Sequence, residues 1–224
     1  MKKAIILSII YFLSCNFSFG QDSTEVKFRI TTTPIQLFFY DFPLNFEKSF
    51  KKYTVGVIAS YRLSTRNSGR VSGGAGLLGG YRTQNFWNPL YNAFTIGLNS
   101  KYYFVKEKHD FIESILFYRY WWFNNKDCEY DNVEGYNFQG TRTERQDIFG
   151  LKLLYGHSFT IKIKSNVKPI IDLYVGLGLR YITYKFETVN GKVKDIYYDY
   201  KQDIGNSWAP TFHFGLKLGL GIFK

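Results

Sequence analysis

Residues 53–63 of this chain are YTVGVIASYRL, and residues 211–223 are TFHFGLKLGLGIF. In both stretches larger apolar residues alternate with small or polar ones. From Phe212 to Ile222 every other residue is Phe, Leu or Ile, and the residues between them are His, Gly and Lys. Because successive side chains of a strand point to opposite faces, this period of two predicts β-strands with one apolar face.

The same alternation predicts six more strands, over 26–39, 42–50, 93–104, 111–123, 148–161 and 169–186. Most of the eight are long enough to cross a bilayer as tilted strands of about nine to eleven residues. The first contains Pro34, which cannot donate to a ladder, so we expect a break or a bulge there. The pattern predicts an all-β fold: one eight-stranded antiparallel up-and-down barrel over residues 21–224.

The lengths of the connections give the barrel two different ends. Short connections are expected at 51–52, 105–110 and 162–168, all on the side of the termini, and long ones over 65–92, 124–147 and 187–208. The connection near residue 40 is the exception, since it is short but lies on the loop side. Short periplasmic turns and long extracellular loops are typical of outer-membrane barrels.

The N-terminus has the layout of a secretory signal peptide over residues 1–20. Lys2 and Lys3 precede an apolar run at 4–13, and a small-x-small cleavage site follows at 18–20. Cys15 follows Phe-Leu-Ser, a distant match to a lipoprotein box, so lipidation at Cys15 is the minority alternative. If Cys15 is removed, Cys128 is the only cysteine left, and no intramolecular disulfide is expected.

Alternation alone does not say which face of the barrel is inside, because a secreted lipocalin-like binder lines its cavity with the apolar face. A polar face rich in glycine suits the narrow interior of an eight-stranded barrel. Aromatic residues are 20% of the chain and group near both ends of the strands, as interfacial girdles do. The loop-side group is Tyr118, Tyr120, Trp121, Trp122, Phe123, Tyr181, Tyr184, Phe186 and Trp208. The sequence therefore favours lipid outside the barrel.

The last strand, FGLKLGLGIFK, together with the signal peptide and the loop pattern, resembles the small outer-membrane β-barrels of Gram-negative bacteria. The stretches PLNFEKSFKKYTVGVIASYR and DLYVGLGLRY are most similar to uncharacterised small barrels of the Bacteroidota. The resemblance implies a porin-like cell-envelope protein in the outer membrane, inserted by the barrel-assembly machinery. Phe223 is penultimate, one residue out of phase with the terminal aromatic that such barrels usually have.

With the apolar face outside, charged side chains point into the barrel. The expected interior set is Glu47, Glu113 and Asp172 with Arg62, Lys101, Arg119, Lys152, Arg180 and Lys217. Buried charges need partners, so we expect a structural ion-pair network that fills the interior. The alternative is a narrow pore, which the basic excess would make anion-preferring.

The sequence favours a structural or surface-interaction role without enzymatic chemistry. The alternative is a membrane-embedded lipid-modifying enzyme of the lipid A deacylase type, suggested by His157 and Ser158. Adjacent residues of a strand point to opposite faces, so this pair cannot act as base and nucleophile. His213 points inward, where we expect a hydrogen-bonded interior histidine.

The net charge of +11 indicates anionic partners. An exported chain meets lipid phosphate rather than nucleic acid, so outer-membrane lipid and lipopolysaccharide are the expected partners. Arg66, Arg70 and Arg82 in the first long loop are candidate contacts for lipopolysaccharide phosphates, or else ordinary solvated charges.

No cofactor is expected. The stretch GGAGLLGG at 73–80 has the glycine spacing of a dinucleotide-binding turn, but no helix pattern follows it and no acidic residue occurs between Glu47 and Glu107. Nucleotide binding is therefore not expected. In the acidic segment 127–138, Asn132 and Phe138 occupy the glycine and glutamate positions of a calcium loop, which leaves no convincing metal site.

Overall fold

The computed structural model describes residues 26–50, 52–65, 68–70, 91–104, 109–131, 137–161, 165–193, 196–198 and 201–223. Eight strands form the main sheet: β1 (Val26–Thr32), β2 (Asp41–Phe50), β3 (Tyr53–Arg62), β5 (Asn92–Tyr103), β6 (Asp110–Asp131), β7 (Asn137–Thr160), β8 (Val167–Val193) and β10 (Lys201–Phe223). Two short strands, β4 (Ser68–Arg70) and β9 (Ile196–Tyr198), pair with β6 and β8. No helix in this part of the chain is long and apolar enough to cross a membrane.

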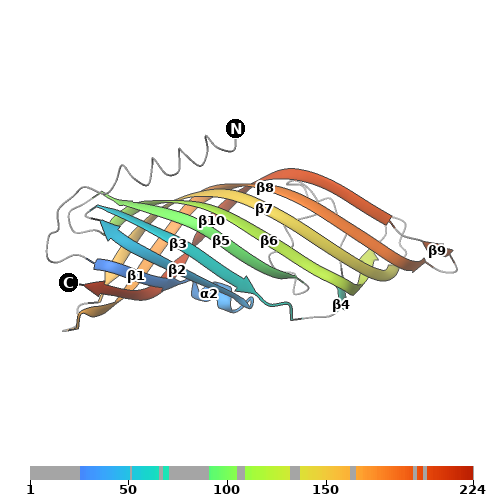
Figure 1. The fold of residues 1–224 in the computed structure, drawn as a ribbon, viewed down its shortest axis with the longest axis horizontal. Coiled ribbons are helices and arrows are strands. Elements are labelled where there is room, and N and C mark those ends of the chain that lie inside the picture. Colours follow the sequence, from blue (N-terminus) through green and yellow to red (C-terminus); the bar gives the residue numbers. More distant parts are fainter. Residues whose placement is uncertain are drawn as a thin grey trace.

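The eight main strands form a closed ring. Each pairs antiparallel with the next one along the chain, and β10 pairs antiparallel with β1, which closes the sheet (Figure 1). The predicted all-β, eight-stranded up-and-down architecture is confirmed. We call the end with the β2–β3, β5–β6 and β7–β8 connections the turn end, and the opposite end the loop end.

Strand β1 is shorter than expected because Pro34 ends it. Residues Pro34–Leu37 form the one-turn helix α2, with proline at the start, where its missing N–H costs no helical hydrogen bond. The Thr32 hydroxyl donates to the carbonyl of Pro43 at 2.7 Å and ties the end of β1 to β2. The expected break at Pro34 is therefore observed, and a register shift between Val26 and Phe28 adds a bulge.

Strands β6, β7, β8 and β10 are longer than the sequence pattern indicated. Much of the expected loop regions 124–147 and 187–208 is strand, and Figure 1 shows these strands extending past the ends of β3 and β5. The extensions are polar on both faces, so no apolar alternation marked them. Cross-strand pairing forms them instead, from Lys126 opposite Arg142 to Gln202 opposite Glu187.

The two faces of the sheet differ sharply in polarity. On the outer face Leu177 is 66% exposed and Phe214 is 73% exposed, whereas Lys101, Glu113 and Asp172 on the inner face are 0% exposed. This distribution is the reverse of that in a water-soluble protein, which buries aliphatic side chains and exposes charged ones. We refer to the exposed apolar side chains of the outer face as the apolar belt.

Outward aromatic side chains lie near both ends of the belt. At the loop end the rings of Tyr120 and Trp122 stack with centroids 5.3 Å apart, and at the turn end those of Tyr53 and Tyr102 are 5.0 Å apart. Three residues of the expected loop-side group instead point inward and are buried: Trp121, Phe123 and Phe186. In a run of consecutive aromatic residues on one strand, every second ring must face the interior.

Candidate functional site: the charged interior of the barrel

Six charges near the turn end form a balanced group, the turn-side cluster: Arg29, Lys101, Lys217, Glu47, Glu113 and Asp172. The Lys101 Nζ lies 2.8 Å from Asp172 Oδ2 and 2.8 Å from Glu47 Oε1. The Lys217 Nζ lies 2.7 Å from both carboxylate oxygens of Glu113. All six are at most 6% exposed, so three cations and three carboxylates compensate one another away from water.

Neutral side chains complete the hydrogen bonding of these carboxylates. Asn99 Nδ2 donates to Glu47 at 2.8 Å and to Glu113 at 2.9 Å, which links the two acids. The Ser158 hydroxyl donates to Asp172 at 2.6 Å. Buried ion pairs are stable only when such additional hydrogen bonds satisfy the remaining acceptors, and here they do.

A glycine allows this cluster to form. Gly56 on β3 lies between Glu47 on β2 and Asn99 on β5, and a Cβ there would be 2.5 Å from Asn99 Oδ1 and 2.8 Å from Glu47 Cγ. The missing side chain leaves the space in which the two neighbouring side chains meet.

A second group, the middle cluster, is unbalanced. It consists of Arg62, Arg119, Lys152 and Arg180 with the carboxylate of Asp41. The Arg119 Nη2 lies 3.0 Å from Asp41 Oδ2, and its Nε donates to the Thr95 hydroxyl. The guanidinium carbons of Arg62 and Arg119 lie 5.2 Å and 5.8 Å from the ring centroid of Trp121. Among the described residues of this cluster, four cations share one carboxylate.

A third group, the loop-side cluster, lies in the polar extension of the barrel. The Arg142 Nη2 is 2.8 Å from Glu144 Oε2, and Gln146 donates to the other oxygen of the same carboxylate. The guanidinium carbon of Arg142 is 3.9 Å from the ring centroid of Phe186. All three polar residues are at most 3% exposed.

Inward apolar side chains also fill part of the interior. The rings of Tyr91 and Phe123 meet edge to face at 4.8 Å, and Tyr91 and Trp121 approach to 5.3 Å. Ile148 and Ile182 pack in the same buried group. The interior therefore alternates between charged and apolar layers, as expected where eight strands leave room only for side chains.

All nine residues of the expected interior set point inward, divided between the turn-side and middle clusters. Sequence reasoning missed Arg29, Asp41, Arg142 and Glu144. The alternation of the sequence could have identified Arg29 as an inward charge, since it lies between the outward Phe28 and Ile30. Asp41 lies at the first residue of β2, and Arg142 and Glu144 lie in the stretch expected to be a loop, so strand alternation did not identify them.

His157 and Ser158 point to opposite faces of β7. The His157 Nδ1 lies 2.7 Å from Asp110 Oδ1, and its ring stacks on His109 at 5.5 Å, whereas the Ser158 hydroxyl is bound to Asp172 inside the barrel. The histidine and the serine therefore cannot cooperate in nucleophilic catalysis. His213 is hydrogen-bonded in the interior, with its Nε2 2.8 Å from the Thr211 hydroxyl. In the part of the chain that the structure describes, no group of three or more His, Cys, Asp or Glu residues could hold a metal ion.

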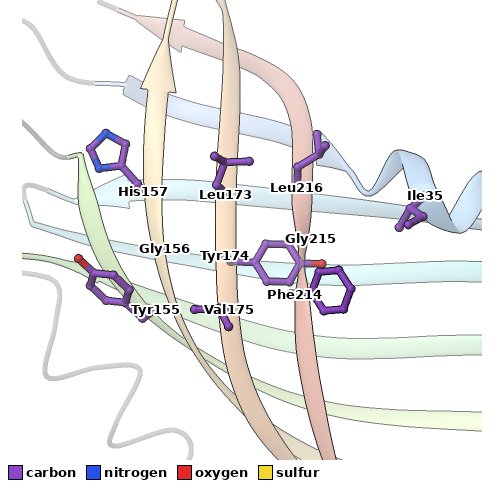
Figure 2. Close-up of a pocket in the computed structure, with 10 residues that line it drawn as sticks. All are labelled: Ile35, Tyr155, Gly156, His157, Leu173, Tyr174, Val175, Phe214, Gly215 and Leu216. Carbon is purple, nitrogen blue, oxygen red and sulfur yellow. The ribbon is translucent and has the colours of Figure 1, made fainter.

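A shallow pocket of about 620 Å³ lies along β7, β8 and β10 beside α2. Figure 2 shows that it is lined mostly by aromatic and aliphatic side chains, among them Tyr155, Leu173 and Phe214. The ring of Tyr174 is directed toward β10, where a Cβ on Gly215 would be 2.8 Å from its hydroxyl (Figure 2). With so few polar groups, the pocket suits hydrocarbon better than a charged ligand.

Beyond the belt, the loop end contains a partly exposed ion pair. The hydrogen bond from Lys185 Nζ to Glu187 Oε1, at 2.8 Å, lowers the pKa of Glu187, and Gln202 donates to the same oxygen at 3.1 Å. Of the candidate lipopolysaccharide contacts, Arg66 and Arg82 lie outside the described residues, and only the backbone of Arg70 is described, in β4. The expected signal peptide over 1–20 and the glycine-rich stretch at 73–80 also lie outside them.

Searches of protein-family models, curated proteins and solved structures found no match to this chain. Its function is therefore argued from its own geometry.

Proposed function

We propose that this chain is an outer-membrane β-barrel protein with a structural or surface-interaction role and no enzymatic activity. The observation that carries the proposal is the sidedness of the barrel wall. Large apolar side chains cover the outside of the described strands, while the ion-paired charges of the turn-side cluster are buried inside. A bilayer is the solvent in which this distribution is stable, because hydrocarbon solvates the belt and the closed ring satisfies the backbone.

The energetics favour this proposal over a secreted lipocalin-like binder. Such a binder places its apolar side chains around an internal cavity, whereas here Leu153, Leu177 and Phe214 are among more than thirty large apolar side chains exposed on the surface. Each Å² of apolar surface left in water costs about 25 cal/mol, so a belt of this size makes a soluble state unfavourable.

The interior supports a structural role. The turn-side cluster links strands far apart in the sequence, for example Lys101 on β5 to Asp172 on β8, and thereby holds the ring closed. The extended β6–β7 and β8–β10 hairpins project past the belt at the loop end and offer a polar surface for contact with partners. In this proposal Arg66, Arg70 and Arg82 contact lipopolysaccharide, residues 1–20 are a cleaved signal peptide, and the barrel-assembly machinery inserts the chain.

The test is to express the full chain in a Gram-negative host, separate the inner and outer membranes, and compare boiled and unboiled samples by gel electrophoresis. We expect the protein in the outer-membrane fraction, with different migration before and after boiling because a detergent-stable barrel remains folded until it is heated. Soluble protein in the periplasm or medium, or identical migration of the two samples, would contradict the proposal. A change in the mass of lipid A upon expression would instead indicate a lipid-modifying enzyme.

A further inference from the structure

Among the described residues, Lys152 and Arg180 in the middle cluster have no ion-pair partner. Within the described part of the chain, neither side chain forms an ion pair or a hydrogen bond, and the buried Nε of Arg180 has no acceptor. In the described part of the chain, Lys152 makes one cation–π contact, with the ring of Phe117, whose centroid is 4.9 Å from its Nζ. Burying cations without an anion is costly, so this arrangement calls for a compensating negative charge.

The carboxylates of the interior do not supply this charge. Glu47, Glu113 and Asp172 are ion-paired in the turn-side cluster, and Asp41 and Glu144 are ion-paired with Arg119 and Arg142. Among the side chains that the structure describes, these are the acidic ones that face the interior. Lys152 also lies within electrostatic range of three cations, Arg119, Arg180 and Lys217, and of one carboxylate, Glu113. Because Glu113 is already ion-paired with Lys217, the net charge around Lys152 is positive.

Two interior glycines, Gly150 on β7 and Gly178 on β8, lie beside four inward side chains that can donate hydrogen bonds. Gly150 is the cross-strand partner of Arg180; a Cβ on it would meet the ring of Phe117 and lie 3.2 Å from Arg180 Cγ, so these two side chains occupy the space at Gly150. Gly178 is the cross-strand partner of both Lys152 and Thr211. A Cβ on Gly178 would be 2.7 Å from the Thr211 hydroxyl and 3.0 Å from His213 Nε2. Lys152, Thr211 and His213 thus flank Gly178, where Thr211 and His213 are hydrogen-bonded to each other, and Arg180 lies beside Gly150 on the same two strands.

These four residues are also less buried than those of the turn-side cluster. Lys152, Arg180, Thr211 and His213 all face inward, yet each is partly exposed to solvent, in contrast to the fully buried turn-side cluster. Arginine and lysine together are the side chains that bind oxyanions most strongly, through the planar fork of one and the point charge of the other.

We propose that Lys152, Arg180, Thr211 and His213 form a binding site for one phosphate-sized oxyanion in the lumen of the barrel. The proposal goes beyond the structural role above and does not depend on it, since the site lies inside the ring whether or not the ring is in a membrane. The ligand is a free ion, because the donors point away from the lipid-facing surface.

The test is calorimetric titration of the folded barrel, in an uncharged detergent, with inorganic phosphate at constant ionic strength set by sodium chloride. We expect saturable binding of one phosphate per barrel. Lys152→Gln and Arg180→Gln should each weaken it by about tenfold or more, because each removes a charge-assisted hydrogen bond. Lys48→Gln is the matched control, since it removes an outward cation and should leave binding unchanged.

Thr211→Val is the replacement test variant if Lys152→Gln and Arg180→Gln do not fold. It retains every charge and nearly the same side-chain volume while removing one hydrogen-bond donor. It should weaken phosphate binding, with folding verified by heat-modifiable migration. No saturable binding to the wild-type barrel, or equal binding by the wild type and all three variants, would overturn the proposal. Binding of a short-chain phosphatidic acid without binding of inorganic phosphate would also overturn it, because the phosphate group would then belong to a lipid.

Discussion

The turn-side and middle clusters occupy the same lumen and are built from the same residue types. They differ in how far carboxylates compensate the cations. In the turn-side cluster Lys101 bridges two carboxylates, and its side chain is inaccessible to solvent. In the middle cluster Lys152 contacts an aromatic ring and faces partly accessible space. We infer from this comparison that the first cluster stabilises the barrel, and we place the proposed oxyanion site in the second.

The largest expected effect is that of Lys101→Met, in the turn-side cluster. The substitution leaves Glu47 and Asp172 without their shared cation, and removing one partner of a buried ion pair costs about 3–5 kcal/mol. The measurement is the free energy of unfolding in urea, followed by tryptophan fluorescence after refolding into lipid vesicles. Lys48→Met, on the outer face, is the matched control. A loss below about 1 kcal/mol would show that the cluster does not hold the ring together.

Ser158→Ala should have a smaller effect in the same cluster. It removes the hydroxyl that donates to Asp172 at 2.6 Å and leaves a buried carboxylate oxygen unsatisfied, at a cost of about 1–3 kcal/mol. Ser114→Ala, at an exposed position of β6, is the control and should change little. The same urea titration compares the two, and equal effects of both substitutions would mean that the bond to Asp172 contributes nothing specific.

The smallest effect, and the one that separates the two clusters, is expected for Lys152→Met. In phosphate-free buffer it removes one of several like charges, so the free energy of unfolding should rise or stay within about 1 kcal/mol of the wild-type value. A loss as large as that of Lys101→Met would contradict the distinction, because it would show that Lys152 is already compensated. Repeating the measurement with phosphate should stabilise the wild type more than the variant.

The sequence predicted the sidedness of the barrel well because sidedness is a local property. Alternation within one strand decides which way Glu47 or Lys217 points, and it identified nine inward charges. The partners of these charges were not predictable, since the Lys101–Asp172 pair joins residues 71 positions apart through the closed ring and its register. Arg142 and Glu144 were missed because a strand that is polar on both faces has no alternation to detect.

The grouping of the nine residues into a balanced and an unbalanced cluster also required the structure. Gly150 and Gly178 are spaced like the other interior glycines in the sequence. Only cross-strand pairing places them opposite Arg180 and Lys152.

Contact between lipid and the outer face of the barrel can be measured by fluorescence quenching at Leu177. A single cysteine is introduced there or at Gln202, an exposed position of the loop-end extension, in a chain in which Cys15 and Cys128 are both replaced by serine, and is labelled with a fluorophore in vesicles. We predict that brominated acyl chains quench the Leu177 label while aqueous iodide does not, and that the Gln202 label shows the opposite response. A Leu177 label that is quenched by iodide and unaffected by brominated lipid would contradict the account.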